Sequence, residues 1–325
     1  ISVLSGKDLE DRGVLSISEI ISTVPGVNLR NVQPGFPDYV VRGTSAGNGS
    51  GDFGNRIITI YLDEFALGQE SADIALIDIS RVELLKGPQG TLYGKSAMGG
   101  VFRYITNEPT TEGFSGGVNA YGSSTSSSDG NNYGAQGYLN IPLTDNLAAR
   151  VVAYNFDNDG YIDANGADKA KDVNTSEITG GRLALKWDIN ESTSLDVTYL
   201  NQKVETGATE RIGSTYTPIA TSSAVCPCPA PPDLQAPNRS TLTRQYAGEP
   251  WDFDTEMLNL KLDKEFEGFD LSVMAARSSQ TLLRSAVANN FVSVTSAGRL
   301  FTSKAERSSE VDTFEVRLVS DAESD

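Results

Sequence analysis

The chain has 325 residues, and its 26 Lys and Arg against 43 Asp and Glu give a formal net charge of −17. Nucleic-acid binding needs a clustered basic surface for phosphate contacts, and the sequence has no such run of cations. Histidine is absent, which excludes Ser-His-Asp and Cys-His catalysis together with metal ligation by histidine.

Residues 1–110 mix short elements. Ser5 precedes one short helical pattern, and Ser16 precedes a second at residues 17–24, which Pro25 ends. Extended segments are predicted at residues 26–30, 39–43, 57–63, 81–86 and 101–106, with glycine-rich connections between them, above all at residues 44–55. These elements predict a small α+β domain.

Residues 111–325 change to long alternating strands, of which we count about eight. In several, one face is apolar and the other is charged or amidic, as with Leu258, Leu260 and Leu262 against Lys261 and Asp263. Period two with one apolar face indicates an antiparallel sheet. The strands are predicted at residues 114–122, 133–143, 147–156, 177–189, 194–205, 254–266, 269–283 and 311–320.

The connections between these strands alternate in length. Tight turns at residues 144–146, 190–193 and 267–268 alternate with longer loops at residues 123–132, 157–176, 206–253 and 284–310. Short turns at one end and long loops at the other are typical of bacterial outer-membrane barrels, and a soluble β-sandwich has no reason to sort its loops this way. The pattern therefore favours membrane-spanning strands of a β-barrel.

Aromatic residues near the strand ends fit the same interpretation. An outer-membrane barrel carries girdles of aromatic side chains at both interfaces, although any single aromatic also fits an ordinary core position. The candidates for the girdle are Tyr138, Tyr154, Phe156, Trp187, Tyr199 and Phe266.

Residues 81–100 contain glycines followed by Gly94, Lys95 and Ser96, which invites comparison with a phosphate-binding loop. That motif needs four residues between its two glycines. Gly90 leaves only three before Gly94, and Pro88 removes a backbone donor. We therefore reject the nucleotide-binding reading.

The stretch at residues 78–109 (DISRVELLKGPQGTLYGKSAMGGVFRYITNEP) closely resembles the plug-domain signature of TonB-dependent outer-membrane receptors. Three earlier pieces follow the family's order, namely residues 20–29 (IISTVPGVNL), 41–43 (VRG) and 60–63 (IYLD). Residues 159–162 (DGYI) and 314–319 (FEVRLV) also resemble strand segments of the family. The resemblance is strongest over residues 1–110.

The resemblance implies a plug domain at residues 1–110 and barrel strands at residues 111–325, in a receptor of the 22-stranded, plugged type. It implies localisation in the bacterial outer membrane, no enzymatic activity, no cofactor, and uptake of a scarce nutrient, most often a ferric siderophore. We expect the chain to lack part of such a receptor at both ends, including the N-terminal box that contacts the TonB complex. Outer-membrane lipid is the other expected partner, and the full-length receptor is expected to be a monomer.

Site residues follow from the resemblance only where positions match. Arg42 and Lys86 match basic plug positions that pair with carboxylates of the barrel wall in the family, although Lys86 stands where Arg is common. The loop at residues 44–55 and the segment at residues 65–73 are the candidates for ligand contact. The named ligand-binding candidates are Asp52, Phe53, Asn55 and Gln69.

Two questions remain open at this stage. A passive porin or adhesin-like barrel with a soluble N-terminal domain would also carry alternating strands, but it does not need the plug signature. Cys226 and Cys228 fit either a loop disulfide or two free thiols. The acidic loop at residues 157–166 fails the EF-hand order, so no metal site is predicted.

Overall fold

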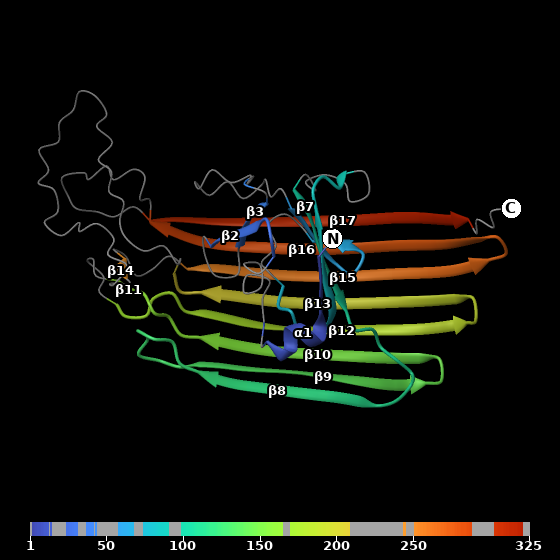
Figure 1. Ribbon diagram of the computed structural model, residues 1–325, viewed down its shortest axis with the longest axis horizontal. Helices are drawn as coiled ribbons and strands as arrows, with labels where there is room; N and C mark the ends of the chain where they lie inside the picture. Colours follow the sequence, from blue (N-terminus) through green and yellow to red (C-terminus); the bar gives the residue numbers. More distant parts are fainter. Residues whose placement is uncertain are drawn as a thin grey trace, which may run out of the picture.

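The computed structural model describes residues 2–12, 14, 24–31, 37–41, 43, 58–67, 74–90, 99–164, 170–208, 243–244, 250–287 and 302–320. Eight long strands lie side by side in one sheet, and a smaller group of short strands lies across one face of it (Figure 1). Within this part of the chain, no helix is long and apolar enough to span a membrane.

The N-terminal part, which we call the plug, is built on a five-stranded sheet in the order β1-β6-β7-β4-β5. β7 runs parallel to β4, and the other neighbours are antiparallel. The strands are β1 (Ser2–Ser5), β4 (Ile58–Leu62), β5 (Phe65–Ala66), β6 (Ile79–Lys86) and β7 (Gly100–Thr106). β2 (Val27–Asn31) and β3 (Pro37–Val41) form a separate antiparallel pair.

The one helix that the structure describes, α1 (Gly6–Asp11), begins at the predicted cap. The Ser5 side chain accepts a hydrogen bond from the Asp8 backbone N–H at 3.1 Å, which satisfies a donor that the first turn leaves open. Gly6 is required here, because a Cβ at that position would lie 1.9 Å from the carbonyl oxygen of Ile79. The second predicted helix, at residues 17–24, falls outside the described residues except for its last one.

The plug core is apolar and continues into the wall. Ile60, Phe102 and Tyr104 are at most 3% exposed, and they belong to a cluster that also contains Met257 and Met274 of the long strands. Burial of this apolar surface contributes to holding the plug sheet against the large sheet.

The large sheet, which we call the wall, has the strand order β17-β16-β15-β13-β12-β10-β9-β8, and all its neighbours are antiparallel. Each predicted strand is present. The strands are β8 (Ser115–Ser123), β9 (Asn132–Thr144), β10 (Leu147–Asn158), β12 (Ser176–Asn190), β13 (Thr193–Thr206), β15 (Trp251–Phe266), β16 (Phe269–Val287) and β17 (Thr302–Ser320). Two short strands in the long connections, β11 (Asp163–Ala164) and β14 (Thr243–Arg244), pair in parallel.

The outer face of the wall, away from the plug, carries an apolar band. A row of exposed side chains crosses five strands in register, from Leu139 through Val151, Leu183 and Tyr199 to Leu258. Exposed large hydrophobic residues in such a continuous band are unfavourable in water and match the lipid-facing surface of a membrane barrel.

The start of β17 corrects one prediction. The sequence predicts a loop at residues 284–310, whereas β16 continues to Val287 and β17 already begins at Thr302. Residues 302–310 are polar on both faces, so they lack the alternation that reveals a half-buried strand. Backbone pairing from Thr302 with Val287 to Glu310 with Ser279 extends the strand past the apolar band.

Three of the girdle predictions are wrong. Tyr154 and Phe156 are 6% and 2% exposed, because they lie on the inner face of β10. Tyr138 lies opposite buried Val152 across the β9–β10 ladder, and its ring stacks on the Arg150 guanidinium, 4.3 Å from the ring centroid. The outer-face candidates Trp187, Tyr199 and Phe266 are 42–44% exposed, as a girdle requires.

Candidate functional site

The ligand-binding candidates Asp52, Phe53, Asn55 and Gln69 lie outside the described residues, as does Arg42. Lys86 ends β6, and its Nζ donates a hydrogen bond to the carbonyl oxygen of Pro25 at 2.8 Å, within the plug. The pairing of Arg42 and Lys86 with wall carboxylates stays a prediction.

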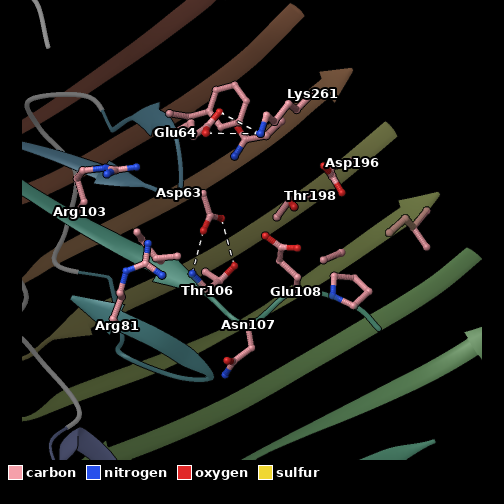
Figure 2. A pocket seen from close by; sticks show the side chains of 16 residues that line it. Asp63, Glu64, Arg81, Arg103, Thr106, Asn107, Glu108, Asp196, Thr198 and Lys261 are labelled. Atoms are coloured by element: carbon pink, nitrogen blue, oxygen red, sulfur yellow. Dashed lines mark hydrogen bonds and ion pairs between the residues drawn. The ribbon is translucent and has the colours of Figure 1, made fainter. Parts of the chain in front are cut away.

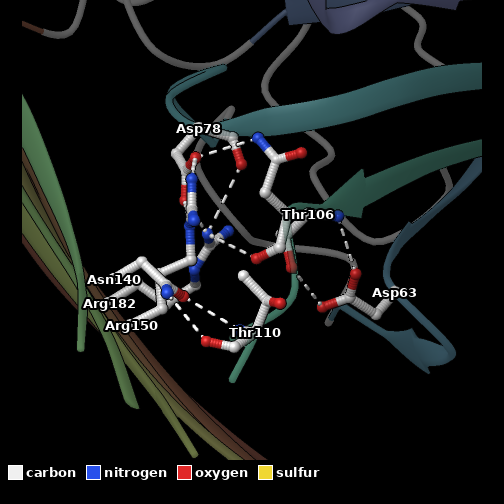
Figure 3. Close-up of polar contacts among 8 residues, drawn as sticks. Asp63, Asp78, Thr106, Thr110, Asn140, Arg150 and Arg182 are labelled. Atoms are coloured by element: carbon white, nitrogen blue, oxygen red, sulfur yellow. Dashed lines mark hydrogen bonds and ion pairs between the residues drawn. The ribbon is translucent and has the colours of Figure 1, made fainter. Parts of the chain in front are cut away.

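A buried ionic cluster joins the plug to the wall through Asp78, the residue before β6. Arg150 of β10 donates from Nε to Asp78 Oδ2 at 2.7 Å and from Nη2 to Asp78 Oδ1 at 2.5 Å. Arg182 of β12 donates from Nη2 to Asp78 Oδ2 at 2.5 Å. All three side chains are at most 9% exposed. Figure 3 shows both guanidinium groups converging on this carboxylate.

The two arginines outnumber the single carboxylate that they contact, and two further side chains complete the contacts of the cluster. The Tyr138 ring lies against the Arg150 guanidinium, which supplies a cation–π contact. The Asn107 side chain donates from Nδ2 to Asp78 Oδ1 at 2.9 Å, so it occupies a remaining acceptor position. Removing one partner from such a buried group leaves an uncompensated charge and is costly.

In the Asp78 cluster the charges are placed the other way round from those that the family resemblance implies for Arg42 and Lys86. Here the plug supplies the carboxylate and the wall supplies the cations. A signal for it was available in the sequence. In a barrel the apolar face of each strand meets lipid, so Arg182, which stands on the face opposite Leu183 and Leu185 of β12, must point toward the plug.

A second contact fixes the segment that leads to Asp78. Gln202 of β13 accepts hydrogen bonds at Oε1 from the backbone N–H of Ala75 at 3.0 Å and from the Tyr154 hydroxyl at 2.8 Å. Ile77 packs with Ala75 against the inner face of β10. Residues 74–78 are therefore held against β10, β12 and β13.

The segment that links the plug to the wall makes polar contacts at every second residue, at Thr106, Glu108 and Thr110. Thr106 donates from its backbone N–H to Asp63 Oδ1 at 2.8 Å, and Lys186 Nζ lies 2.5 Å from Glu108 Oε2. The fully buried Asn140 of β9 accepts from the Thr110 backbone N–H at 2.9 Å and donates to the Thr110 carbonyl at 2.8 Å. The chain thus enters the wall under tight constraint.

A polar cavity of about 250 Å³ lies between the plug and strands β12, β13 and β15 (Figure 2). Its lining carries both signs of charge. The acidic and basic side chains are Asp63, Glu64, Glu108 and Asp196 against Arg81, Arg103 and Lys261. Within the described ranges, no group of three or more acidic or thiol side chains is placed to hold a metal ion.

Some buried polar atoms around this cavity have no hydrogen-bond partner in the described part of the chain, notably Asn259 Oδ1 and Arg103 Nε. Such atoms are ordinarily satisfied by water, and a polar cavity of this size has room for it. We therefore treat the cavity as a hydrated space between the plug and the wall.

Asp63 lies at the plug side of the cavity, in the turn between β4 and β5. Burial raises the pKa of its carboxyl group, because desolvation outweighs the Thr106 hydrogen bonds and the attraction of Arg182, which act in the opposite direction. The carboxylate also accepts from the Thr106 hydroxyl at 3.2 Å. The charged form is thus disfavoured in the folded plug.

Comparison with protein families and curated proteins finds similarity to outer-membrane receptors. A family model described as "TonB-dependent Receptor Plug Domain" matches residues 1–101. The pesticin receptor of Yersinia pestis is 28% identical over 267 residues, which is 78% of this chain and 37% of that protein. The ferripyoverdine receptor of Pseudomonas aeruginosa is 28% identical over 199 residues, which is 61% of this chain and 22% of that protein.

Solved structures agree in fold. The ferric yersiniabactin uptake receptor FyuA of Yersinia pestis superposes with a TM-score of 0.71 at 22% identity, over 87% of this chain and 41% of that one. The ferripyoverdine receptor of Pseudomonas aeruginosa gives 0.72 at 17% identity, over 98% and 39%. The chain thus spans well under half the length of these relatives. Plug strands against an antiparallel wall, as predicted, are the fold shared with these solved structures, and residues 1–101 match the plug domain of TonB-dependent receptors.

Proposed function

We propose that this receptor imports a ferric siderophore or a similar iron complex across the bacterial outer membrane, with energy supplied by the TonB complex. The observation that carries the proposal is the plug itself, which is fastened to the inner face of the wall by Asp78, Arg150 and Arg182. A lumen that is filled in this way does not serve passive diffusion. Import instead needs an energised rearrangement of the plug.

The ligand class rests on the relatives. Their names include ferripyoverdine, ferrioxamine B and ferric yersiniabactin receptors, and all three ligands are iron complexes. The proposal has TonB and outer-membrane lipid as partners, and the receptor acts as a monomer. It involves no enzymatic step. It also includes the division into a plug at residues 1–110 and barrel strands at residues 111–325.

The test is uptake of radioactive iron by cells that produce the receptor from its own gene. Ferric yersiniabactin, ferripyoverdine and ferrioxamine B serve as probes, in otherwise identical strains with and without TonB. Uptake that requires both the receptor and TonB supports the proposal. Uptake that is unaffected by loss of TonB would favour the alternative, a passive porin.

We further propose that Asp52, Phe53, Asn55 and Gln69 contact the ligand. Ala substitutions at Phe53 and Gln69 are expected to weaken surface binding of the transported probe. The control is Lys7→Ala, which removes an exposed ion pair with Asp11 on α1. Equal binding by all these variants would exclude Phe53 and Gln69 from the ligand site.

A further inference from the structure

We propose that the plug is hinged on strands β10, β12 and β13 and parts from strands β15 and β16, so that the ligand passes through the cavity between Glu64 and Lys261. This inference rests on the proposed transport function. It adds the side of the plug that moves and the side that stays fixed.

The fixed side, formed by the contacts of residues 74–78 with the wall, is held by directional bonds between buried groups. Asp78 receives the bidentate contact of Arg150 and the single contact of Arg182, and the three side chains are 3–9% exposed. Gln202 adds the bond to the Ala75 backbone. Moving Asp78 away from Arg150 and Arg182 would leave buried charges without their partners. This cost opposes movement of the plug on the fixed side.

The opposite side, which we call the sliding side, meets the wall through different chemistry. Met257 of β15 and Met274 of β16 pack against the plug core and are at most 2% exposed. Methionine side chains are flexible and unbranched, so they adapt to a neighbour that shifts. Van der Waals contacts of this kind have no fixed direction and re-form after small displacements.

The ion pair on the sliding side is weaker than the cluster on the fixed side. Lys261 Nζ lies 3.5 Å from Glu64 Oε2, and the two side chains are 27% and 31% exposed. Partly exposed pairs at this separation contribute little, because water still screens them. Glu64 stands in the turn between β4 and β5, where it follows Asp63, at the edge of the plug sheet.

The cavity borders this side. It already separates the β4–β5 turn from β15, and strands β12 and β13 of the fixed side form its other boundary. Its polar lining includes Asn259, whose Oδ1 has no partner among the described residues. Widening a hydrated polar gap exposes groups that already face water, so it costs less than opening a dry one. Figure 2 shows Glu64 and Lys261 pointing toward one another across the rim of this space.

The test uses two matched Glu–Lys pairs that join the plug side to the wall. Glu64→Cys with Lys261→Cys spans the sliding side, and Glu108→Cys with Lys186→Cys lies beside the fixed side, where the native pair is 2.5 Å apart. Both are made in the complete receptor with Cys226→Ser and Cys228→Ser. A short bis-thiosulfonate reagent links each pair, and a reductant releases it.

The probes are ferric yersiniabactin, ferripyoverdine and ferrioxamine B labelled with radioactive iron. Linking residues 64 and 261 is expected to lower the initial rate of uptake at least about tenfold without loss of surface binding, and reductant restores the rate. Linking residues 108 and 186 is expected to leave the rate within about twofold of the rate of the same double-cysteine variant before linking, so that the effect of replacing Glu108, which lines the cavity, cancels.

Normal uptake with residues 64 and 261 linked would overturn the hinge, and so would loss of uptake with residues 108 and 186 linked. The uncross-linked parent separates this result from the proposed function. If the parent takes up none of the probes, or takes them up without TonB, the proposed function fails. If the parent transports and the cross-links give the opposite pattern, the hinge alone fails.

Discussion

Asp63 and Asp78 both adopt the left-handed backbone conformation, with φ of 54° and 56°, and they bind two consecutive residues at the end of β7. Asp63 accepts from the Thr106 backbone, and Asp78 accepts at its carbonyl oxygen from the Asn107 backbone N–H at 3.0 Å. This conformation is uncommon for residues other than glycine, although Asp tolerates it better than most. Two strained corners thus fix the point where the chain leaves the plug.

The buried carboxyl group of Asp63 predicts a dependence of plug stability on pH. Its folded-state pKa is raised above the ordinary value of 3.8, so the protonated form is the one that folding favours. The stabilising contribution is fully present below pH 3.8 and is lost as the pH rises through the raised pKa. Asp63→Asn keeps the shape and the acceptor for Thr106, and it is expected to stabilise the plug at pH 7 and to flatten the pH dependence.

The measurement is the urea concentration at the midpoint of plug unfolding in the purified receptor, at several pH values between 4 and 7. Limited proteolysis reports the unfolding. Lys7→Ala on the exposed face of α1 serves as the control. If Asp63→Asn destabilised the plug at pH 7 more than at pH 4, the attraction between charged Asp63 and Arg182 would outweigh the desolvation of the carboxylate.

Asp78→Asn is expected to loosen the fixed side by about 3–5 kcal/mol, because it removes the charge of the carboxylate that both buried guanidinium groups contact. The same substitution in an Arg182→Met background should cost less, since one uncompensated charge is then removed. A double-mutant cycle on the free energy of plug unfolding measures this coupling. Strictly additive effects would mean that Asp78 and Arg182 act independently.

Gln202→Leu and Tyr154→Phe separate the two hydrogen bonds that Gln202 accepts from Ala75 and Tyr154. Tyr154→Phe removes one hydrogen bond and leaves Gln202 bonded to the Ala75 backbone, so the expected loss is about 1 kcal/mol. Gln202→Leu leaves two buried donors without this acceptor, at about 1–3 kcal/mol for each. Amide hydrogen exchange at Ala75 reports the difference. Equal exchange in the two variants would contradict the assigned role of Gln202.

The apolar band predicts an effect that depends on depth. Leu260 lies on the outer face of β15 within the band and is 41% exposed, whereas Glu256 lies on the same face outside it. Leu260→Arg is expected to destabilise the barrel by about 2–4 kcal/mol, and Glu256→Arg by about 0–1 kcal/mol. Folding of the complete receptor into lipid vesicles measures both. Equal costs would place the edge of the hydrocarbon region elsewhere.

Local pattern was sufficient to predict most of the wall. Leu258, Leu260 and Leu262 alternate with polar neighbours, and this alternation follows directly from the geometry of a strand in which successive side chains face opposite ways. The same rule fails at residues 302–310, where both faces of β17 are polar. There the strand is held by backbone pairing with β16, and such pairing leaves no trace in side-chain periodicity.

The contact of Asp78 with Arg150 and Arg182 on the fixed side was not predicted from the sequence. Asp78 lies in the stretch at residues 78–109 that resembles the plug signature, and Arg150 and Arg182 lie on predicted strands. Partner choice across 72 and 104 residues of separation depends on how two sheets meet, which a local pattern does not encode. Tyr154 and Phe156 were misplaced because both faces of β10 carry apolar side chains, Val151 on one and Val152 on the other, so the alternation in this strand does not tell which face meets the plug.

The short ladder between β1 and β6 acquires a mechanical meaning from these contacts. Ser5 pairs with Arg81, three residues after Asp78, and Ser2 pairs with Leu84. Tension applied at Ser2 is therefore transmitted through four paired residues into the strand that begins at the anchored corner. The fixed cluster becomes the fulcrum of a lever whose free arm is the β4–β5 edge of the plug.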